Sequence, residues 1–181
     1  MHRILALLAL AALPAAAQTV DYAKSEISFV SKQMNVPVEG RFDSFAAQIR
    51  FDPKKPSEGQ AQIEVDLASV STGSADADTE VKKKAWFNLA AFPTAKFVST
   101  EVRSVGPGRF EAQGKLTIKG VTRDVVAPFT VKTAGASTVF EGVFPLMRLQ
   151  FNVGEGAWSD TETVADEVQV RFRIVQSGKA K

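Results

Sequence analysis

Histidine and cysteine, the side chains that most often carry catalytic or metal chemistry, are almost absent from this chain. Among its 181 residues there is no cysteine, and the single histidine is His2. Once His2 is removed with a leader segment, the chain cannot build a Ser/His/Asp triad, a thiolate nucleophile or the usual zinc and copper ligand sets. Carboxylates, lysines and Tyr22 remain, but they form no catalytic constellation. We therefore expect no catalytic residue, no metal ligand and no cofactor.

Two charged clusters are candidate binding sites of lower specificity. Lys82, Lys83 and Lys84 suit a pyrophosphate group, although three consecutive lysines on a helix usually form a solvated face. Four acidic residues near the C-terminal end suit calcium, but they lack the spacing of an EF-hand loop. These residues are Asp160, Glu162, Asp166 and Glu167. We expect exposed lysines and no calcium site.

The N-terminal segment has the pattern of a secretory signal peptide. Arg3 is followed by the apolar run ILALLALAALPAAAQ, which ends in small residues at positions 15–17. Cleavage after Ala17 is expected, with residues 18–181 forming one domain in the periplasm. A retained N-terminal anchor is the alternative. Loss of Arg3 lowers the formal net charge from +2 to about +1, which offers no electrostatic attraction to nucleic acid or anionic lipid.

The dominant pattern in the rest of the chain is the alternation of apolar and polar residues that is typical of half-buried β-strands. It is clearest over residues 168–174, where VQVRFRI places every apolar side chain at an even number. Similar runs cover residues 27–29, 45–51, 63–67, 97–105, 116–118, 125–131 and 139–151. About eight strands are expected. Arg148, between Met147 and Leu149, is expected on the outer face.

Short turns separate these strands and predict an antiparallel sheet. GPG at 106–108, KG at 119–120 and AG at 134–135 are turn sequences that leave no room for crossover helices. Long antiparallel strands must close or be covered, because open edges pair with other chains. An all-β, eight-stranded up-and-down barrel is the economical arrangement. A two-sheet sandwich is the alternative.

One segment interrupts the alternation and predicts a short α-helix over residues 78–89. Acidic residues precede lysines, which is the charge order that a helix dipole favours. Val81, Ala85 and Leu89 would share one face, and Pro93 would end the run. We expect this helix to lie across one mouth of the barrel, with the rings of WFNLAAFPTAKF at its end.

Five segments resemble the YceI family in their order and spacing. They are the helix that ends in a double aromatic, FPTAKFVST, GKLTIKGVTRDVVAPFTV at 114–131, RLQFNVGEGAW at 148–158 and ADEVQVRFRI at 165–174. The resemblance covers roughly residues 20–175. It implies a lipocalin-like barrel, exported to the periplasm in many members, with an apolar interior that accepts a polyisoprenoid chain.

The candidate ligand-binding residues are large apolar side chains at inward-facing strand positions or beside the expected helix. For each of them, plain core packing is an equally good explanation, since eight strands barely leave an interior. The candidates are Phe29, Phe42, Phe45, Trp86, Phe87, Phe92, Phe97, Leu116, Ile118, Met147, Phe151 and Trp158. Met147 and Met34 suit an irregular cavity wall best, because thioethers are flexible.

The resemblance and the missing histidine together predict a non-catalytic carrier or storage protein for a polyisoprenoid or an isoprenoid quinone. A transient contact with the inner membrane or a membrane enzyme is expected, as is a homodimer, and no nucleic acid. Two alternatives stay open. One is an interaction protein with a filled barrel, and the other is a lipid-modifying enzyme that uses Tyr22 or carboxylates.

Overall fold

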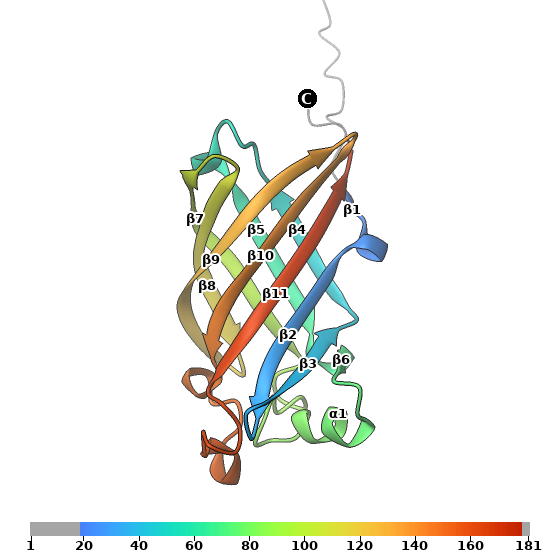
Figure 1. The fold of residues 1–181 in the computed structure, drawn as a ribbon, viewed down its shortest axis with the longest axis vertical. Helices are drawn as coiled ribbons and strands as arrows, with labels where there is room; N and C mark the ends of the chain where they lie inside the picture. Colours follow the sequence, from blue (N-terminus) through green and yellow to red (C-terminus); the bar gives the residue numbers. More distant parts are fainter. Residues whose placement is uncertain (1–18, 179–181) are drawn as a thin grey trace, which may run out of the picture.

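The structure, a computed structural model, describes residues 19–178; the expected leader at 1–17 lies outside them. One antiparallel sheet of eleven strands curls into a half-barrel, with α1 at its lower end (Figure 1). Its longer strands are β2 (Glu26–Gln33), β3 (Val36–Phe42), β4 (Phe45–Arg50), β5 (Gln60–Asp66), β7 (Thr94–Gly106), β8 (Arg109–Ile118), β9 (Val121–Ala134), β10 (Ser137–Met147) and β11 (Glu167–Ser177). Two-residue strands are β1 (Thr19–Val20) and β6 (Val70–Ser71).

The expected all-β, lipocalin-like architecture is confirmed, but the strand count differs slightly. Within residues 19–178, nine strands have six or more residues, where about eight were expected. The additional one is β3, because Pro37 and Gly40 interrupt its apolar pattern. The strands from β7 to β11 have 10 to 14 residues each, and β9, β10 and β11 cross the front of Figure 1.

The sheet has two ends, and they meet along a seam. The strand order is β4-β5-β7-β8-β9-β10-β11-β2-β3-β6, with β1 added beside β11. Side chains bridge the seam: the Ala47 N–H donates to Tyr22 Oη at 3.3 Å, and Gln176 Nε2 donates to the Ile49 carbonyl at 2.9 Å. The half-barrel is therefore closed here by side chains and not by a backbone ladder.

Alternating side chains of the strands fill the interior in two clusters. The upper cluster lies towards the β9–β10 turn and includes Phe110, Phe129 and Phe140. The lower cluster lies towards α1 and includes Leu67, Leu116, Ile118 and Phe151. Both are built from inward positions of strands that alternate as the sequence predicts, apart from residues in short helical turns.

The helix α1 (Ala75–Val81) is shorter and begins earlier than expected. It begins after Ser74, whose hydroxyl accepts a hydrogen bond from the Ala77 N–H. The expected continuation to Leu89 is wrong, because the backbone changes course after Val81: the Phe87 N–H bonds to the Val81 carbonyl, and Asn88 has a φ of +51°. Residues 82–93 form turns instead, which close the lower end of the half-barrel.

A second segment at the lower end replaces an expected strand. β10 ends at Met147, and Arg148–Phe151 form the 3-10 helix η4, followed by η5 (Gly156–Ser159). Other 3-10 turns are η1 (Tyr22–Lys24), η2 (Pro56–Glu58) and η3 (Leu67–Ser69). The continuous strand expected over residues 139–151 is therefore wrong beyond Met147, where the chain folds back under the sheet.

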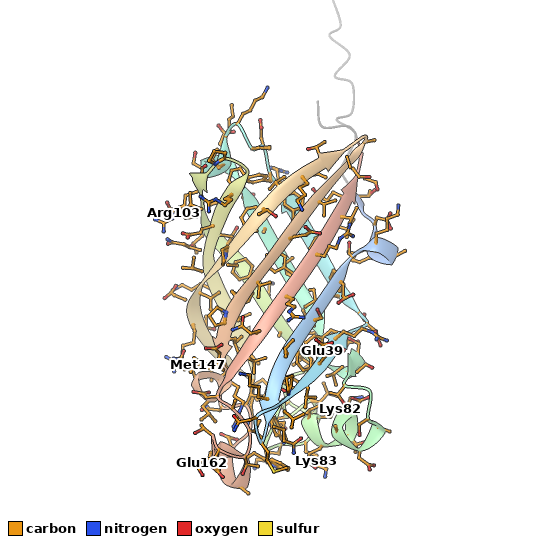
Figure 2. All side chains as sticks on the ribbon, viewed as in Figure 1. Glu39, Lys82, Lys83, Arg103, Met147 and Glu162 are labelled. Atoms are coloured by element: carbon orange, nitrogen blue, oxygen red, sulfur yellow. The ribbon has the colours of Figure 1, made fainter. Side chains whose placement is uncertain are left out.

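The face assignment of β10 also needs correction. Phe140 and Phe144 point inward from this strand, whereas Val143 is 48% exposed and Met147 is 37% exposed. Met147 lies on the outer side of the sheet near its lower end (Figure 2). Met34 lies in the exposed β2–β3 turn. The two methionines therefore lie outside the cavity wall. The pattern misplaces Met147 because β10 carries apolar residues on both of its faces.

Candidate functional site

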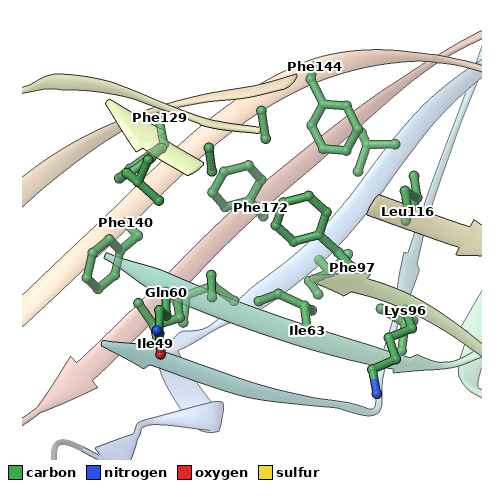
Figure 3. A pocket seen from close by; sticks show the side chains of 18 of the residues that line it. Ile49, Gln60, Ile63, Lys96, Phe97, Leu116, Phe129, Phe140, Phe144 and Phe172 are labelled. Atoms are coloured by element: carbon green, nitrogen blue, oxygen red, sulfur yellow. The ribbon is translucent and has the colours of Figure 1, made fainter. Parts of the chain in front are cut away.

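An apolar cavity lies inside the half-barrel, between the upper and lower clusters (Figure 3). Its volume is about 150 Å³, and 18 of its 20 lining residues are apolar. Rings of Phe97, Phe144 and Phe172 lie around it, with Ile63 facing them from β5. An apolar cavity of this size in a protein stays dry and takes up a benzene-sized molecule. The site therefore suits a hydrocarbon group.

Small residues on four strands leave room for this space. Ala61, Ala95, Ala112 and Ala127 come from β5, β7, β8 and β9 and all line the cavity. On the inward face of β8, Phe110 precedes Ala112, and Gly114 and then Leu116 follow it. Because interiors are otherwise packed to crystal-like density, four alanines on neighbouring strands leave an unfilled volume. The sequence contains this signal, since FEAQGKLTI places Ala, Gly and Leu on one face.

Glycines in the sheet let phenylalanine rings lie flat against its inner face. A side chain on Gly142 would collide with the ring of Phe172, and one on Gly40 would collide with the ring of Phe29. Each glycine pairs in register with the phenylalanine of the adjacent strand. The rings therefore occupy the space above a glycine and do not cross the axis of the half-barrel.

Four aromatic rings close the upper end of the cavity. Phe51 packs edge-on against Phe110, Phe129 and Phe140, with ring centroids 5.0, 5.6 and 5.9 Å away. Offset and edge-to-face pairs of this kind add stability beyond the area that they bury. Phe51, Phe129 and Phe140 also line the cavity, so this aromatic plug sets its upper limit.

Arg148 organises the lower end. It is 2% exposed, and its guanidinium donates five hydrogen bonds of 2.6 to 3.1 Å to backbone carbonyl groups. The acceptors are Val153, Gly154, Trp158, Val164 and Ala165. Burial lowers the pKa of Arg148, and the charge of Asp166 opposes that shift. All five N–H groups are satisfied, so one side chain fixes the segment from Val153 to Ala165 in place.

The expectation that Arg148 lies on the outer face is therefore wrong. Its guanidinium also stacks 5.6 Å from the ring centroid of Trp86, which itself contacts Trp158 at 5.4 Å. The alternation rule fails here because η4 begins at Arg148 and turns its side chain under the sheet. The cap made of residues 82–93 and 148–166 rests on this contact.

The profile of YceI-like domains matches residues 18–176. The chain belongs to the YceI-like family. A UPF0312 protein of Shewanella denitrificans is 35% identical over 140 residues, which is 74% of this chain and 70% of that protein. The chain spans less than half the length of another relative, the UPF0312 protein plu2095 of Photorhabdus laumondii, at 36% identity over 87 residues.

Solved structures of other proteins have the same fold. BcnA of Burkholderia cenocepacia is 48% identical with a TM-score of 0.85, and the match covers 87% of this chain and 99% of that one. A polyisoprenoid-binding domain of Saccharophagus degradans has a TM-score of 0.71 at 17% identity, covering 90% and 99% of the two chains. The second likeness concerns the fold alone.

Two of the twelve candidate residues line the cavity of this YceI-like chain, namely Phe97 and Leu116. Ile118 and Phe151 belong to the lower cluster. The others lie at the lower end, at the seam or outside. Phe29, Phe42 and Phe87 form a chain of contacting rings, and Trp86 and Trp158 pair beside Arg148. Phe92 packs on Gly120, Phe45 contacts Tyr22, and Met147 is on the outer face. A ligand-contact role stays a prediction for all of them.

The pattern of large side chains in the sequence does not single out the four alanines or three of the rings that line the cavity. Phe140, Phe144 and Phe172 line the cavity, as do Ile27 and Ile49. Large side chains alone do not locate the site, because the space also depends on where small side chains line the interior. Phe172 lies on the inward face of the strand predicted over residues 168–174, so the sequence alone already indicates that its ring faces the interior.

The charged clusters behave as ordinary surface features. Lys82, Lys83 and Glu162 lie at the lower end (Figure 2), where Lys83 is paired with Glu80. Among residues 19–178, no group of three His, Cys, Asp or Glu side chains is placed to hold a metal ion. Asp160 and Asp166 instead accept hydrogen bonds within the cap. Over the same residues, the helices are too short or too polar to cross a bilayer.

Proposed function

We propose that this protein binds an amphiphile with a polyisoprenoid tail, in the periplasm, and carries or stores it without changing it chemically. The observation that carries the proposal is the apolar cavity inside the half-barrel, kept open by alanines on four strands. The Saccharophagus domain of the same fold, which binds polyisoprenoid, supports the same class of ligand. Cleavage of residues 1–17 on export is part of the proposal.

The volume of the cavity limits how much of a lipid tail fits without rearrangement of the side chains that line it. An isoprene unit has five carbon atoms and is close to benzene in size, so about 150 Å³ accommodates on the order of one unit. Moving one unit from water into the cavity gains roughly 4 kcal/mol, at about 0.8 kcal/mol per carbon. A longer tail needs more space than the resting cavity holds, and rings such as Phe144 and Phe172 must then turn aside.

Removal of a tail from a bilayer gains far less, because the tail is already dry there. Polar contacts of the head group must then contribute to binding, or a membrane partner must deliver the lipid. The transient membrane contact, the membrane-enzyme partner and the homodimer stay predictions. An isoprenoid quinone is one candidate ligand, because it has both an apolar tail and a polar head.

Filling the cavity tests the proposal. Ala112→Leu adds three carbon atoms to the wall, and Ala127→Val adds two as a milder variant. We expect the prenyl lipid extracted from the purified protein and measured by mass spectrometry to fall by about fivefold or more in Ala112→Leu. Ala46→Leu, on the exposed face of β4, is the matched control and keeps its full load.

The proposal fails under either of two results. One is an extract of the wild-type protein that contains no prenyl lipid and a chain that takes up none on incubation. The other is equal loading of Ala112→Leu and Ala46→Leu while both remain folded by circular dichroism. Retained secondary structure and urea midpoints separate a filled cavity from an unfolded chain, since overpacking itself costs about 1 to 3 kcal/mol.

A second candidate function rests on the outer surface. Val126 on β9 and Val143 on β10 are 46% and 48% exposed, and Met147 lies further along β10. Exposed apolar residues on neighbouring strands favour an interaction protein that contacts a membrane-enzyme partner. An empty lipid extract together with loss of partner binding in Val143→Ser would support this function over the carrier.

A catalytic role has weaker support. Tyr22, the side chain that an acid–base mechanism would use, accepts a hydrogen bond from Ala47 and packs on Phe45. It holds the seam in this arrangement. An activity on prenyl lipids that is lost in Tyr22→Phe with binding intact would overturn the non-catalytic proposal.

A further inference from the structure

A second hollow lies on the seam where β4 meets β2 and β3. Its volume is about 460 Å³, and unlike the inner cavity it is lined mainly by polar side chains, among them Tyr22, Glu26, Arg41 and Asp43. Among residues 19–178, no backbone ladder joins β4 to β2 or β3. We call this hollow the seam cleft.

The seam cleft and the inner cavity share a wall. Phe42 lines the cleft and pairs in register with Ile27, which lines the cavity. Phe45 lines the cleft and pairs in register with Val65, which also lines the cavity. Facing residues in an antiparallel ladder have Cα atoms about 4.5 to 5.5 Å apart. One residue layer therefore separates the two spaces.

Both ends of the cavity are packed. The aromatic plug of Phe51 and its partners closes the upper end, and the cap held by Arg148 closes the lower end. At the seam, by contrast, no backbone ladder is formed within the described part of the chain. Two single hydrogen bonds join its sides, from the Ala47 N–H to Tyr22 and from the Gln176 side chain to Ile49. The seam is the side on which least structure must move to connect the cavity with solvent.

The charges of the seam cleft indicate which head group it suits. Arg41 Nε donates to Asp43 Oδ1 at 2.6 Å, and both side chains are more than half exposed. Asp43, with a smaller effect of Glu26, raises the pKa of Arg41, so the guanidinium stays charged. Two carboxylates and one cation give the cleft a net charge of −1, which opposes an anionic head group.

Hydrogen-bond donors remain in the cleft. The Tyr22 oxygen accepts the Ala47 N–H, so its own O–H proton is directed to another acceptor. Arg41 engages Asp43 through Nε, which leaves its two terminal nitrogens as donors at an exposed position. An oxygen atom without charge, such as an alcohol or a quinone carbonyl, matches these groups.

We propose that the seam cleft binds the polar head of the amphiphile, and that this head is an uncharged oxygen group and not a diphosphate. The tail then passes between Phe42 and Phe45 into the inner cavity. This inference rests on the proposed function, since it places the head of the same ligand. It makes the seam, rather than either end of the half-barrel, the route by which the tail enters.

Two probes with the same tail test the head-group preference. Geranylgeraniol and geranylgeranyl diphosphate are titrated against the full mature chain, and the ratio of their dissociation constants is measured. We expect the wild-type protein to bind the alcohol more tightly. Glu26→Gln combined with Asp43→Asn changes the cleft from −1 to +1 and should shift the ratio about tenfold towards the diphosphate.

The control removes the same number of carboxylates elsewhere. Glu101→Gln with Asp124→Asn alters β7 and β9, away from the seam, and should leave the ratio within about twofold of the wild type. Tyr22→Phe is a second cleft variant that removes one hydroxyl. It should weaken the binding of geranylgeraniol several-fold and leave the affinity for geranylgeranyl diphosphate nearly unchanged.

Each outcome has a separate meaning. Equal ratios in the wild type and in both cleft variants, with Ala112→Leu still weakening both probes, would overturn the cleft and leave the proposed function standing. A wild-type preference for the diphosphate, or a ratio that depends on Lys83→Gln with Lys84→Gln instead, would also overturn it by moving the head to the lower end. Failure of both probes to bind the wild type contradicts the proposed function itself.

Discussion

Gly114 on β8 lies directly against the ring of Phe97 on β7. A Cβ atom on Gly114 would be 2.5 Å from Cε2 of Phe97 and 2.5 Å from the Val98 carbonyl oxygen. Contacts this short do not occur, so the ring keeps its place only because position 114 has no side chain. Phe97 lines the cavity, and Gly114 thereby determines how far that ring extends into it.

Gly114→Ala should therefore reduce the cavity. We expect the affinity for geranylgeraniol to fall by about fivefold or more, with a loss of about 1 to 3 kcal/mol in the free energy of unfolding from overpacking. Urea titration and probe binding measure the two effects. Gly40→Ala is a matched control, since it creates the same collision with Phe29, which does not line the cavity.

A double variant separates the ring from the backbone. Phe97→Leu in the Gly114→Ala background removes the collision, so part of the lost affinity should return, as a coupling between neighbouring residues predicts. If Gly40→Ala weakens binding as much as Gly114→Ala does, the ring of Phe97 does not limit the cavity.

Arg148 should dominate the stability of the lower end. In Arg148→Ala, five backbone carbonyls lose their donor in a buried position, and we expect the free energy of unfolding to fall by more than about 3 kcal/mol. Arg148→Lys keeps a charge but has three donors and no planar fork, so it should recover part of this loss. Urea midpoints measure both variants, and an alanine variant within about 0.5 kcal/mol of the wild type would contradict the role.

Asp78 should make the α1 region sensitive to acid. Its Oδ1 accepts hydrogen bonds from the hydroxyl and the N–H of Thr72, each at 2.7 Å, and the hydroxyl bond is the main cause that lowers the pKa of Asp78 below 3.8. A carboxyl with a lowered pKa stabilises the fold above its unfolded pKa, and this stabilisation disappears as the pH falls through the folded value.

Asp78→Asn should thus lower the urea midpoint at pH 7, and the difference from the wild type should shrink as the pH falls from about 4 towards 2. Asp76→Asn, in the same first turn of α1, is the control. A difference between wild type and Asp78→Asn that stays constant over this range would show that the charge of Asp78 is not involved.

Phe51→Ala should open the upper end of the cavity. The variant removes the ring that contacts three other phenylalanines, at a cost of about 3 kcal/mol in unfolding free energy. The freed space extends the cavity, so we expect longer prenyl alcohols to gain affinity relative to shorter ones. Phe92→Ala, at the lower end, should leave the chain-length preference unchanged, and a similar shift in both variants would argue against the plug.

The alternation of side chains predicted the sheet well because it is a local property. Residues 168–174 show period two over most of β11, and Val170, Phe172 and Ile174 do line the cavity. β10 shows the limit of the same rule: Phe140 and Val143 are both apolar, so the pattern alone did not indicate which faces inward.

The cavity and the cap depend on contacts between segments far apart in the chain. Gly114 meets Phe97 only because of the register between β7 and β8, which no local pattern encodes. The burial of Arg148 likewise depends on backbone carbonyls up to 17 residues further along the chain, which the turn at η4 brings around its guanidinium. From the alternation alone, an arginine between Met147 and Leu149 is predicted to lie on the surface, because the alternation does not reveal the turn at η4.

Under the proposed function, the cavity would also link the amount of this protein to the supply of its ligand. A void of about 150 Å³ costs roughly 3 to 4 kcal/mol relative to a filled core, at about 24 cal/mol per Å³. A bound tail occupies that void, so the loaded form withstands heat and proteases better than the empty one. Cells short of the lipid should accordingly clear the idle protein faster, and a half-life measured with and without prenyl synthesis would report on it.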